Sequence, residues 1–175
     1  MSVYLRRKRR RAVTIMVIGA VAALAVLIPS NPLLVWNATA SAPLGLYRLE
    51  APVELHRGDL ALVKLPSSIG KFAAQRGYLP VTVPLIKPVA ALAGEIVCGI
   101  GSFIFIGGNV AARRLDRDTQ GRVMPRWEGC RSLGPDDAFL LNPSVQASFD
   151  GRYFGVVSRR AILGRLIPIW LLHRS

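Results

Sequence analysis

The chain has 175 residues, which is enough for one domain and a terminal extension. Its hydrophobic content of 51% and its mean hydropathy of +0.37 are high for a wholly soluble domain and indicate a membrane-embedded stretch. The net charge of +13 would suit a nucleic-acid partner, but six of the basic residues lie within residues 6–11, directly before an apolar run. The positive-inside rule accounts for that cluster, so nucleic acid is not an expected partner.

Residues 12–28 carry no charge and predict a membrane-spanning helix. At about 1.5 Å per residue this segment would cover about 25 Å, which is the short end of what crosses a bilayer. The basic residues before it would stay in the cytoplasm and direct the rest of the chain outward. We therefore expect a basic cytoplasmic tail over 1–11, a transmembrane helix over 12–28, a linker over 29–35 and one extracytoplasmic domain over 36–175.

A cleaved signal peptide is the alternative, because basic, apolar and small-residue elements all occur near the N-terminus. The small-residue patterns are Ala-Thr-Ala at 38–40 and Ala-Ser-Ala at 40–42. Both lie well beyond residue 28, and Pro43 follows the second, so a retained anchor is favoured.

The extracytoplasmic domain is predicted to be mainly β, with short strands between turns. We expect strands at 60–65, 138–142 and 152–158, a hairpin at 95–100 and 102–106, and a short helix at 67–76 with Ser67 as its N-cap and Gly77 as its stop. The apolar segment 161–173 is interrupted by Gly164 and Pro168, which makes it too short to cross a membrane. It either completes the β core or lies on the membrane surface, where Trp170 would suit the interface.

The two cysteines, Cys98 and Cys130, do not form a zinc-binding pattern with His56 and His173, and we expect no metal or other cofactor. An exported domain would permit a disulfide between them, and two separate buried thiols are the alternative. The histidines also lack a G-x-S-x-G neighbour, which argues against a Ser-His-Asp triad. No H-E-x-x-H, P-loop or G-x-G-x-x-G motif occurs.

Lys87 is the only charged residue between Arg76 and Glu95. Burial among apolar residues disfavours the ammonium form and lowers the pKa of a lysine. At a pKa near 8, roughly a tenth of the side chain would be neutral at pH 7 and able to take a proton from a serine hydroxyl. The alternative is a lysine that extends from an apolar strand to reach solvent.

Four motifs occur in order along the chain: SAPLGLYRL at 41–49, RGDLALV at 57–63, LIKPVAALAGEIVC at 85–98 and NPSVQASFDGRYFGVVS at 142–158. Together they resemble the successive conserved segments of the type I signal peptidase family. They are most similar to its conjugative-transfer branch, the TraF peptidases, which mature the conjugative pilin precursor. The resemblance runs from about Trp36 to Ser158. It implies an antiparallel β domain preceded by a membrane anchor, on the periplasmic side of a bacterial inner membrane, with a Ser/Lys dyad.

The resemblance also implies a role for each matching residue. Ser41 matches the nucleophile and Lys87 the general base. Thr39 matches the hydroxyl residue that completes the oxyanion hole with the backbone N–H of Ser41, and Ser148 matches the serine that orients the lysine. Three further residues are expected to support the site. Asn37 would lie on the same face as residues 39 and 41 if this stretch is an extended strand. Asp150 and Arg152 are expected to form a structural ion pair.

Three positions depart from the family pattern. Ala42 stands where signal peptidases of general secretion usually have Met, which favours the conjugative branch. Gly151 replaces the second serine of the common sequence SFDSRYFG, and Glu95 stands where Asp is usual.

The sequence thus predicts a membrane-anchored serine endopeptidase that processes an exported precursor such as a conjugative pilin. An acyl-enzyme would be resolved by water, or by the substrate's own amine to give a cyclic product. Its other partners would be membrane lipid, contacted by the N-terminal helix and the C-terminal apolar segment, and conjugation-channel proteins. The alternatives are a general signal peptidase acting on many exported proteins and an inactive anchored assembly factor of a conjugation or secretion channel.

Overall fold

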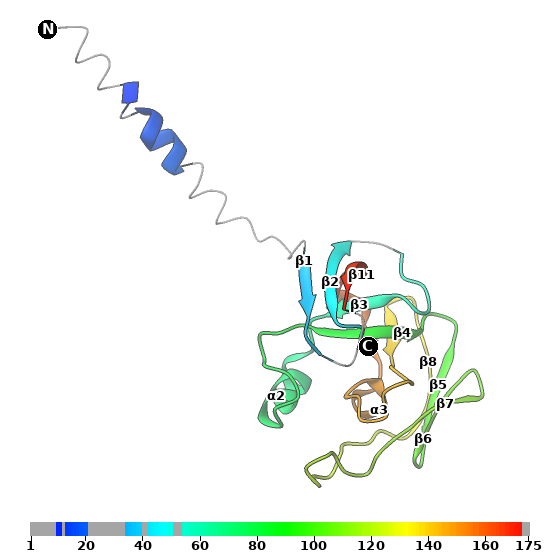
Figure 1. Cartoon of the computed structure of the whole chain (residues 1–175). Helices are drawn as coiled ribbons and strands as arrows, with labels where there is room; N and C mark the ends of the chain where they lie inside the picture. Colours follow the sequence, from blue (N-terminus) through cyan, green and yellow to red (C-terminus); the bar gives the residue numbers. More distant parts are fainter. Residues whose placement is uncertain (1–9, 12, 21–33, 40–41, 51–53, 173–175) are drawn as a thin grey trace, which may run out of the picture. The chain divides into compact units, whose positions relative to one another are not determined.

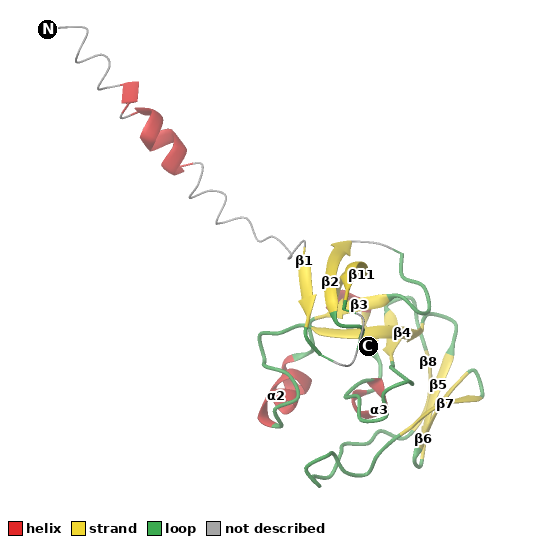
Figure 2. Cartoon of the chain, viewed as in Figure 1, coloured by secondary structure: helices red, strands yellow, loops and turns green. Residues whose placement is uncertain are grey.

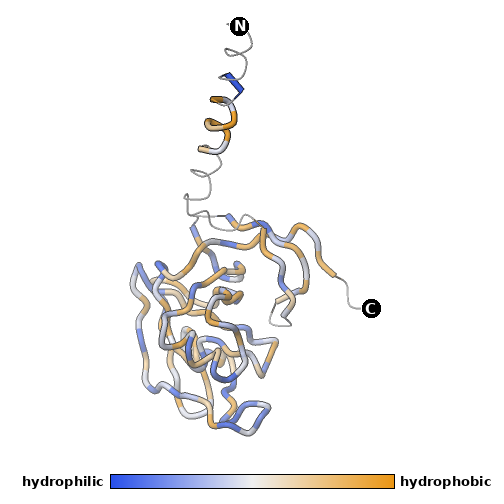
Figure 3. Tube along the Cα trace, turned by 90° about the vertical axis from the view of Figure 1, so that its left-hand side faces the viewer, coloured by the Kyte–Doolittle hydropathy of each residue, from blue (hydrophilic) through white to orange (hydrophobic). Residues whose placement is uncertain are grey.

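The structure is a computed structural model that describes residues 10–11, 13–20, 34–39, 42–50 and 54–172. The chain divides into two units, residues 1–32 and 33–175, and each is considered by itself. In the first unit, residues 10–11 and 13–20 are helical, and Figure 3 shows that residues 13–20 are mostly hydrophobic. Within the described parts of the chain, no helix has the length and apolar character needed to cross a membrane. The predicted transmembrane helix includes residues 12 and 21–28, which lie outside the described residues, so it stays a prediction.

The second unit is built around an antiparallel sheet of seven strands (Figures 1 and 2). Their order across the sheet is β1 (Leu34–Asn37), β2 (Gly45–Glu50), β11 (Ile162–Leu171), β3 (Leu60–Val63), β4 (Leu85–Ala91), β9 (Asp137–Leu140) and β10 (Val157–Ser158). The mainly β prediction is confirmed, as are the strands expected near 60–65 and 138–142. β1 begins at Leu34, and the predicted domain bounds of 36–175 stay a prediction.

A second antiparallel sheet has four strands, in the order β7 (Asn109–Arg113), β6 (Phe103–Ile106), β5 (Ile96–Ile100) and β8 (Gly129–Ser132). The predicted hairpin is the β5–β6 pair. Cys98 and Cys130 are register partners on β5 and β8 and form a disulfide, which decides between the two alternatives for these cysteines. A core cluster joins the two sheets by packing Val97 and Ile104 with Phe139 and Leu141.

The strands of the larger sheet bury side chains on both faces. Leu85 and Val89 of β4 pack in one core cluster, while Ile86 packs in another. This division follows from the period of two along a strand, which sends successive side chains to opposite faces. Lys87 therefore shares a face of the strand with Leu85 and Val89.

The predicted short helix is confirmed as α2 (Ser67–Gln75), and Gly77 follows it with a φ of +70°. Ser67 is not the N-cap as expected: it is the first helical residue, and Pro66 occupies the cap without a side-chain hydrogen bond. Proline suits a helix start because its ring fixes φ. The first N–H groups of a helix have no partner within the helix, so the N–H that proline lacks removes no helical hydrogen bond.

The strand predicted at 152–158 is wrong over its first half, which forms the helix α3 (Gly151–Phe154). Asp150 causes the difference, because its side chain accepts a hydrogen bond from the backbone N–H of Arg152 and caps the helix. Within the predicted range, Val157 and Ser158 form a strand, β10, and the short 3₁₀ helix η1 (Arg159–Ala161) follows it.

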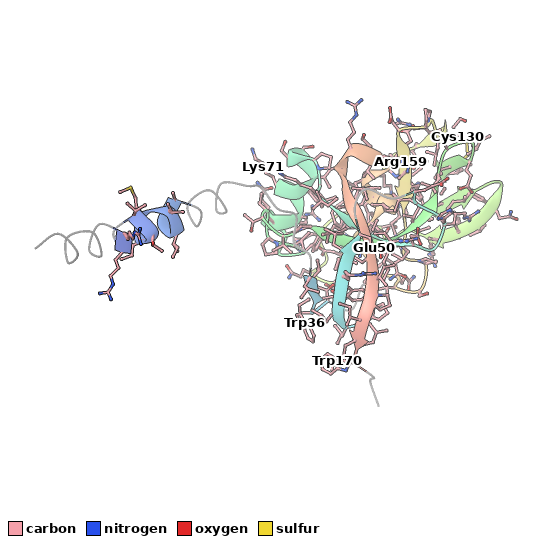
Figure 4. The ribbon with its side chains drawn as sticks, turned by 90° about the horizontal axis from the view of Figure 1, so that it is seen from above. Trp36, Glu50, Lys71, Cys130, Arg159 and Trp170 are labelled. Atoms are coloured by element: carbon pink, nitrogen blue, oxygen red, sulfur yellow. A yellow bond between two sulfur atoms is a disulfide. The ribbon has the colours of Figure 1, made fainter. Side chains whose placement is uncertain are left out.

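The apolar C-terminal segment forms β11 and completes the sheet between β2 and β3, which was one of its two predicted roles. At its far end Trp170 is 57% exposed and lies against Trp36 of β1, with the ring centroids 6.0 Å apart (Figure 4). Gly45 allows β11 to lie close to β2, because a Cβ there would lie 2.1 Å from the carbonyl oxygen of Trp170. His173 lies outside the described residues.

Candidate active site

Lys87 is buried in the middle of β4, with 2% of its surface exposed. Its Nζ donates a hydrogen bond of 2.8 Å to the Oγ of Ser148. Burial lowers the pKa of Lys87 from 10.5 to about 8; the charge of Asp150 opposes this shift and the charge of Arg152 reinforces it. The lysine does not reach solvent, so the alternative of a snorkelling side chain is wrong, and a neutral amine is accessible near physiological pH.

Ser148 lies in the segment between β9 and α3, which is held by a buried ion pair. The guanidinium of Arg152 binds both carboxylate oxygens of Asp150, through Nε at 2.8 Å and Nη2 at 3.0 Å. Both side chains are fully buried, which confirms the predicted ion pair. Arg152 also donates to the carbonyl oxygens of Asn142 at 2.6 Å and Gln146 at 2.9 Å. The ion pair therefore ties together the backbone that leads to Ser148.

This ion pair also limits how strongly Asp150 acts on Lys87. A lone buried carboxylate near a lysine would favour the ammonium and raise its pKa. Here Arg152 neutralises the carboxylate at contact distance and is itself a like charge to the ammonium. Desolvation therefore dominates, and the lysine keeps a low pKa beside an acidic residue.

Gly151 explains one departure from the family pattern. A Cβ at this position would lie 2.6 Å from the carbonyl oxygen of Leu140 and 2.8 Å from the ring of Phe139. A serine there would require the backbone to shift. The indole Nε1 of Trp127 donates to the carbonyl of Gly151 at 2.9 Å, a contact that no motif around Trp127 predicted.

Asn37 and Thr39 lie at the end of β1, in the loop that leads to β2. The Asn37 side chain is 2% exposed. Its Nδ2 lies 3.0 Å from the carbonyl oxygens of Thr39, Ala42 and Pro43. Its Oδ1 accepts from the backbone N–H of Thr39 at 3.0 Å and from the Thr39 hydroxyl at 2.8 Å. The hydroxyl of Tyr47 also donates to the Pro43 carbonyl, at 2.6 Å.

The extended strand expected over residues 37–41 is wrong for its described part. β1 ends at Asn37, and Thr39 lies in a bend. The Asn37 amide replaces the missing strand partners by bonding to the loop backbone. Residues 40 and 41 lie outside the described residues, so the position predicted for the nucleophile, Ser41, remains a prediction.

The described chain next to residue 41 packs in one of the core clusters to which β4 contributes. Ala42, which follows residue 41, packs in one buried cluster with Ile86, which precedes Lys87. Tyr47 of β2 and Leu62 of β3 belong to this cluster as well. The loop after β1 is thus anchored against the strand that carries the buried lysine.

Comparisons with known proteins confirm the resemblance to the signal peptidase family. The family described as signal peptidase, peptidase S26, matches residues 7–171. Over 141 residues the chain is 37% identical to a protein of Sinorhizobium fredii (strain NBRC 101917 / NGR234) named "Probable conjugal transfer protein TraF", covering 73% of this chain and 72% of the relative.

Two further relatives carry similar names. The chain is 34% identical over 145 residues to "Conjugal transfer protein TraF" of Agrobacterium fabrum (strain C58 / ATCC 33970), which covers 77% of this chain and 80% of that protein. It is 31% identical over 145 residues to "Plasmid transfer protein TraF" of Escherichia coli, covering 76% and 80%. The match to the family model spans nearly the whole chain, and the chain belongs to the signal peptidase family, peptidase S26.

Proposed function

We propose that this protein is a membrane-anchored serine endopeptidase in which Ser41 is the nucleophile and Lys87 the general base. The observation that carries the proposal is the state of Lys87: it is buried, its pKa is lowered to about 8, and its amine contacts a serine hydroxyl. A buried lysine held in this way is costly to the fold, because burial disfavours its charged form. Such a group is characteristic of a site that needs a base near neutral pH.

In the proposed reaction the neutral amine of Lys87 takes the proton of the Ser41 hydroxyl while the oxygen attacks the carbonyl carbon of the scissile peptide bond. The negative charge that develops on the carbonyl oxygen is stabilised by the Thr39 hydroxyl and the backbone N–H of Ser41. The C–N bond then breaks, and the Lys87 ammonium returns its proton to the leaving amine. Water or an amine then attacks the ester carbonyl carbon while Lys87 takes its proton. The ester C–O bond breaks, and the Lys87 ammonium returns the proton to the Ser41 oxygen, which restores the free serine.

Ser148 has a positioning role in this proposal. Its Oγ accepts a hydrogen bond from Lys87 Nζ and so directs the amine within the buried site. The Asp150–Arg152 ion pair holds the Ser148 segment without itself touching the reacting atoms.

The substrate class is proposed from the relatives, which are named as conjugal and plasmid transfer proteins. We propose a conjugative pilin precursor, cleaved next to small residues outside the cytoplasmic membrane. The disulfide supports a location outside the cytoplasm, where such bonds persist. Conjugation-channel proteins are the partners that this setting implies.

A second candidate, general signal peptidase activity on many exported proteins, is favoured by the family match alone. Expression in a strain depleted of its housekeeping signal peptidase separates the two candidates. Restored growth would support general activity, and continued arrest together with pilin processing would support the dedicated function.

The proposal is tested by co-expressing the full chain with the pilin precursor of its transfer system and measuring the precursor mass. Wild type is expected to shorten the precursor, whereas Ser41→Ala and Lys87→Ala leave it intact. Lys71→Ala is the matched control, because Lys71 is an exposed lysine of α2 (Figure 4). Normal processing by either site variant, or no processing by wild type, would contradict the proposal.

A further inference from the structure

The two ends of the Asn37 amide bind different groups of the loop after β1: the nitrogen contacts carbonyl oxygens, and the oxygen accepts from an N–H and a hydroxyl. Its NH₂ group contacts three carbonyl oxygens, one before and two after residues 40 and 41. Among the described residues, its oxygen accepts from Thr39, once from the backbone N–H and once from the hydroxyl. Because carbonyl oxygens only accept and a backbone N–H only donates, these partners decide which end of the amide is nitrogen. A buried side chain with this pattern ties Thr39 to Ala42 and Pro43.

The contact between Thr39 and Asn37 also determines where the Thr39 proton points. An amide oxygen can only accept, so the Thr39 hydroxyl donates its single hydrogen to Asn37 Oδ1 in this 2.8 Å contact. The proposed oxyanion hole requires the same hydrogen to point at the substrate oxygen. One hydroxyl hydrogen cannot serve both acceptors fully at once.

We infer that Asn37 is a positioning residue that shapes the loop carrying Ser41 and holds the Thr39 hydroxyl until the oxyanion forms. The inference rests on the proposed function and adds a residue to it. A neutral substrate carbonyl accepts a hydrogen bond about as well as the neutral Asn37 amide does. Moving the Thr39 hydrogen bond from Asn37 to the substrate carbonyl therefore gains little free energy when substrate binds. The oxyanion is charged, and hydrogen bonds to charged groups are roughly twice as strong. The exchange is therefore favourable only as the transition state is reached.

This selectivity has a kinetic consequence. An interaction that strengthens only in the transition state raises kcat and leaves KM nearly unchanged. A side chain that merely stabilised the fold would instead change the amount of folded protein. The two roles are therefore separable by steady-state kinetics on the folded fraction.

The test uses the purified full chain in detergent and the pilin precursor, with Asn37→Ala, Thr39→Val and the double variant. Valine has the shape of threonine and removes only the hydroxyl. We expect Thr39→Val to lower kcat by about 100-fold, which is typical for loss of one oxyanion donor. Asn37→Ala is expected to lower kcat by about 10- to 100-fold, because displacing a catalytic group by about 1 Å costs a rate factor of this order. Its KM should stay within about threefold of the wild-type value. Asn109→Ala is the matched control, because this exposed amide bonds to the Gly107 carbonyl in a distant turn and its loss should leave kcat unchanged.

The double variant distinguishes a role through Thr39 from a general structural one. If Asn37 acts on the Thr39 hydroxyl, the kcat penalty of Asn37→Ala becomes smaller once Thr39→Val is present, because interacting residues are not additive. An equal penalty in both backgrounds, or a kcat within about threefold of wild type, would overturn the inference. Should Asn37→Ala not fold, Asn37→Asp replaces it: this variant keeps the acceptor for Thr39 but loses the three carbonyl contacts. A kcat reduced at least tenfold would then support the inference, and an unchanged kcat would overturn it.

Ser41→Ala measured in parallel keeps the two proposals distinguishable. An active Ser41→Ala overturns the proposed function itself. An inactive Ser41→Ala beside a fully active Asn37→Ala overturns only the role of Asn37.

Discussion

The two sheets of the domain differ in how they are held together, although they share one core cluster. The seven-stranded sheet carries buried polar groups of the candidate site: Asn37 ends β1, Lys87 lies on β4, and the Ser148 segment follows β9. In the four-stranded sheet, β8 is exposed at all four residues and is joined to β5 by the disulfide. Figure 4 shows Cys130 and Lys71 of α2 at opposite ends of the domain.

This contrast has a physical explanation. Buried charges and amides need a surrounding sheet that excludes water and supplies hydrogen-bond partners. A short exposed strand such as β8 buries little apolar surface, and a covalent bond can hold it where packing cannot. We therefore expect substitutions of buried polar groups beside the first sheet to change the reaction or to lower the stability strongly, and substitutions in the second sheet to change only the stability.

The largest expected effect is that of Lys87→Met on the rate. Loss of the proposed general base should lower kcat by about 10²- to 10⁴-fold. The free energy of unfolding should stay the same or rise below pH 8, because burying the ammonium destabilises the fold. Kinetics and denaturant unfolding of the same preparation check both statements. A variant that loses activity only by unfolding would contradict the assignment.

Arg152→Met should have the next largest effect, on stability. It leaves the Asp150 carboxylate buried without its cation, and breaking such a pair costs about 3–5 kcal/mol. Arg131→Met on β8 is the control, because Arg131 is 58% exposed in its ion pair with Asp137 and should cost at most about 1 kcal/mol. Urea unfolding measures both variants, and equal costs would remove the contrast between the sheets.

Removal of the disulfide should lower stability but not the rate. Cys98→Ser with Cys130→Ser releases a cross-link between residues 32 apart, which is worth about 2–4 kcal/mol. The kcat of the folded fraction should stay within about twofold of wild type. A larger loss of kcat would mean that the Trp127–Gly151 contact transmits the state of the small sheet to the Ser148 segment.

The smallest expected effect is that of pH on wild type. Because the proposed reaction needs neutral Lys87, kcat/KM should rise about tenfold between pH 7 and 9, with a midpoint near the pKa of about 8. The free energy of unfolding should also rise above pH 8, since the folded state loses the Lys87 proton before the unfolded state does. Ser148→Ala removes an acceptor of the ammonium and should move the midpoint to lower pH. A profile that is flat from pH 7 to 9 would contradict the role of Lys87 as base.

Much of the Lys87 side of the site could be predicted from the sequence. An isolated lysine in an apolar stretch indicates burial, and burial determines the direction of its pKa shift. The contact with Ser148, 61 residues away, came only from the resemblance to the family, because no local pattern reveals which distant hydroxyl meets a buried amine.

Other features depended on local competition that residue patterns did not reveal. The β-rich composition of residues 152–158 favoured a strand, but capping by Asp150 and the close approach of Gly151 to Leu140 produced a helical turn. Alternation of Asn37, Thr39 and Ser41 favoured an extended strand, whereas the Asn37 amide bonds to the loop after it. In both places a polar side chain next to the site satisfied backbone groups that a strand would have paired.

The most direct test of the central claim is peptide mapping of the full chain after acid quenching of its reaction with the pilin precursor. We predict a precursor fragment esterified to the peptide that contains Ser41, absent from Ser41→Ala and much reduced in Lys87→Ala. A precursor fragment bound at another residue, or cleavage of the precursor by Ser41→Ala, would contradict the account.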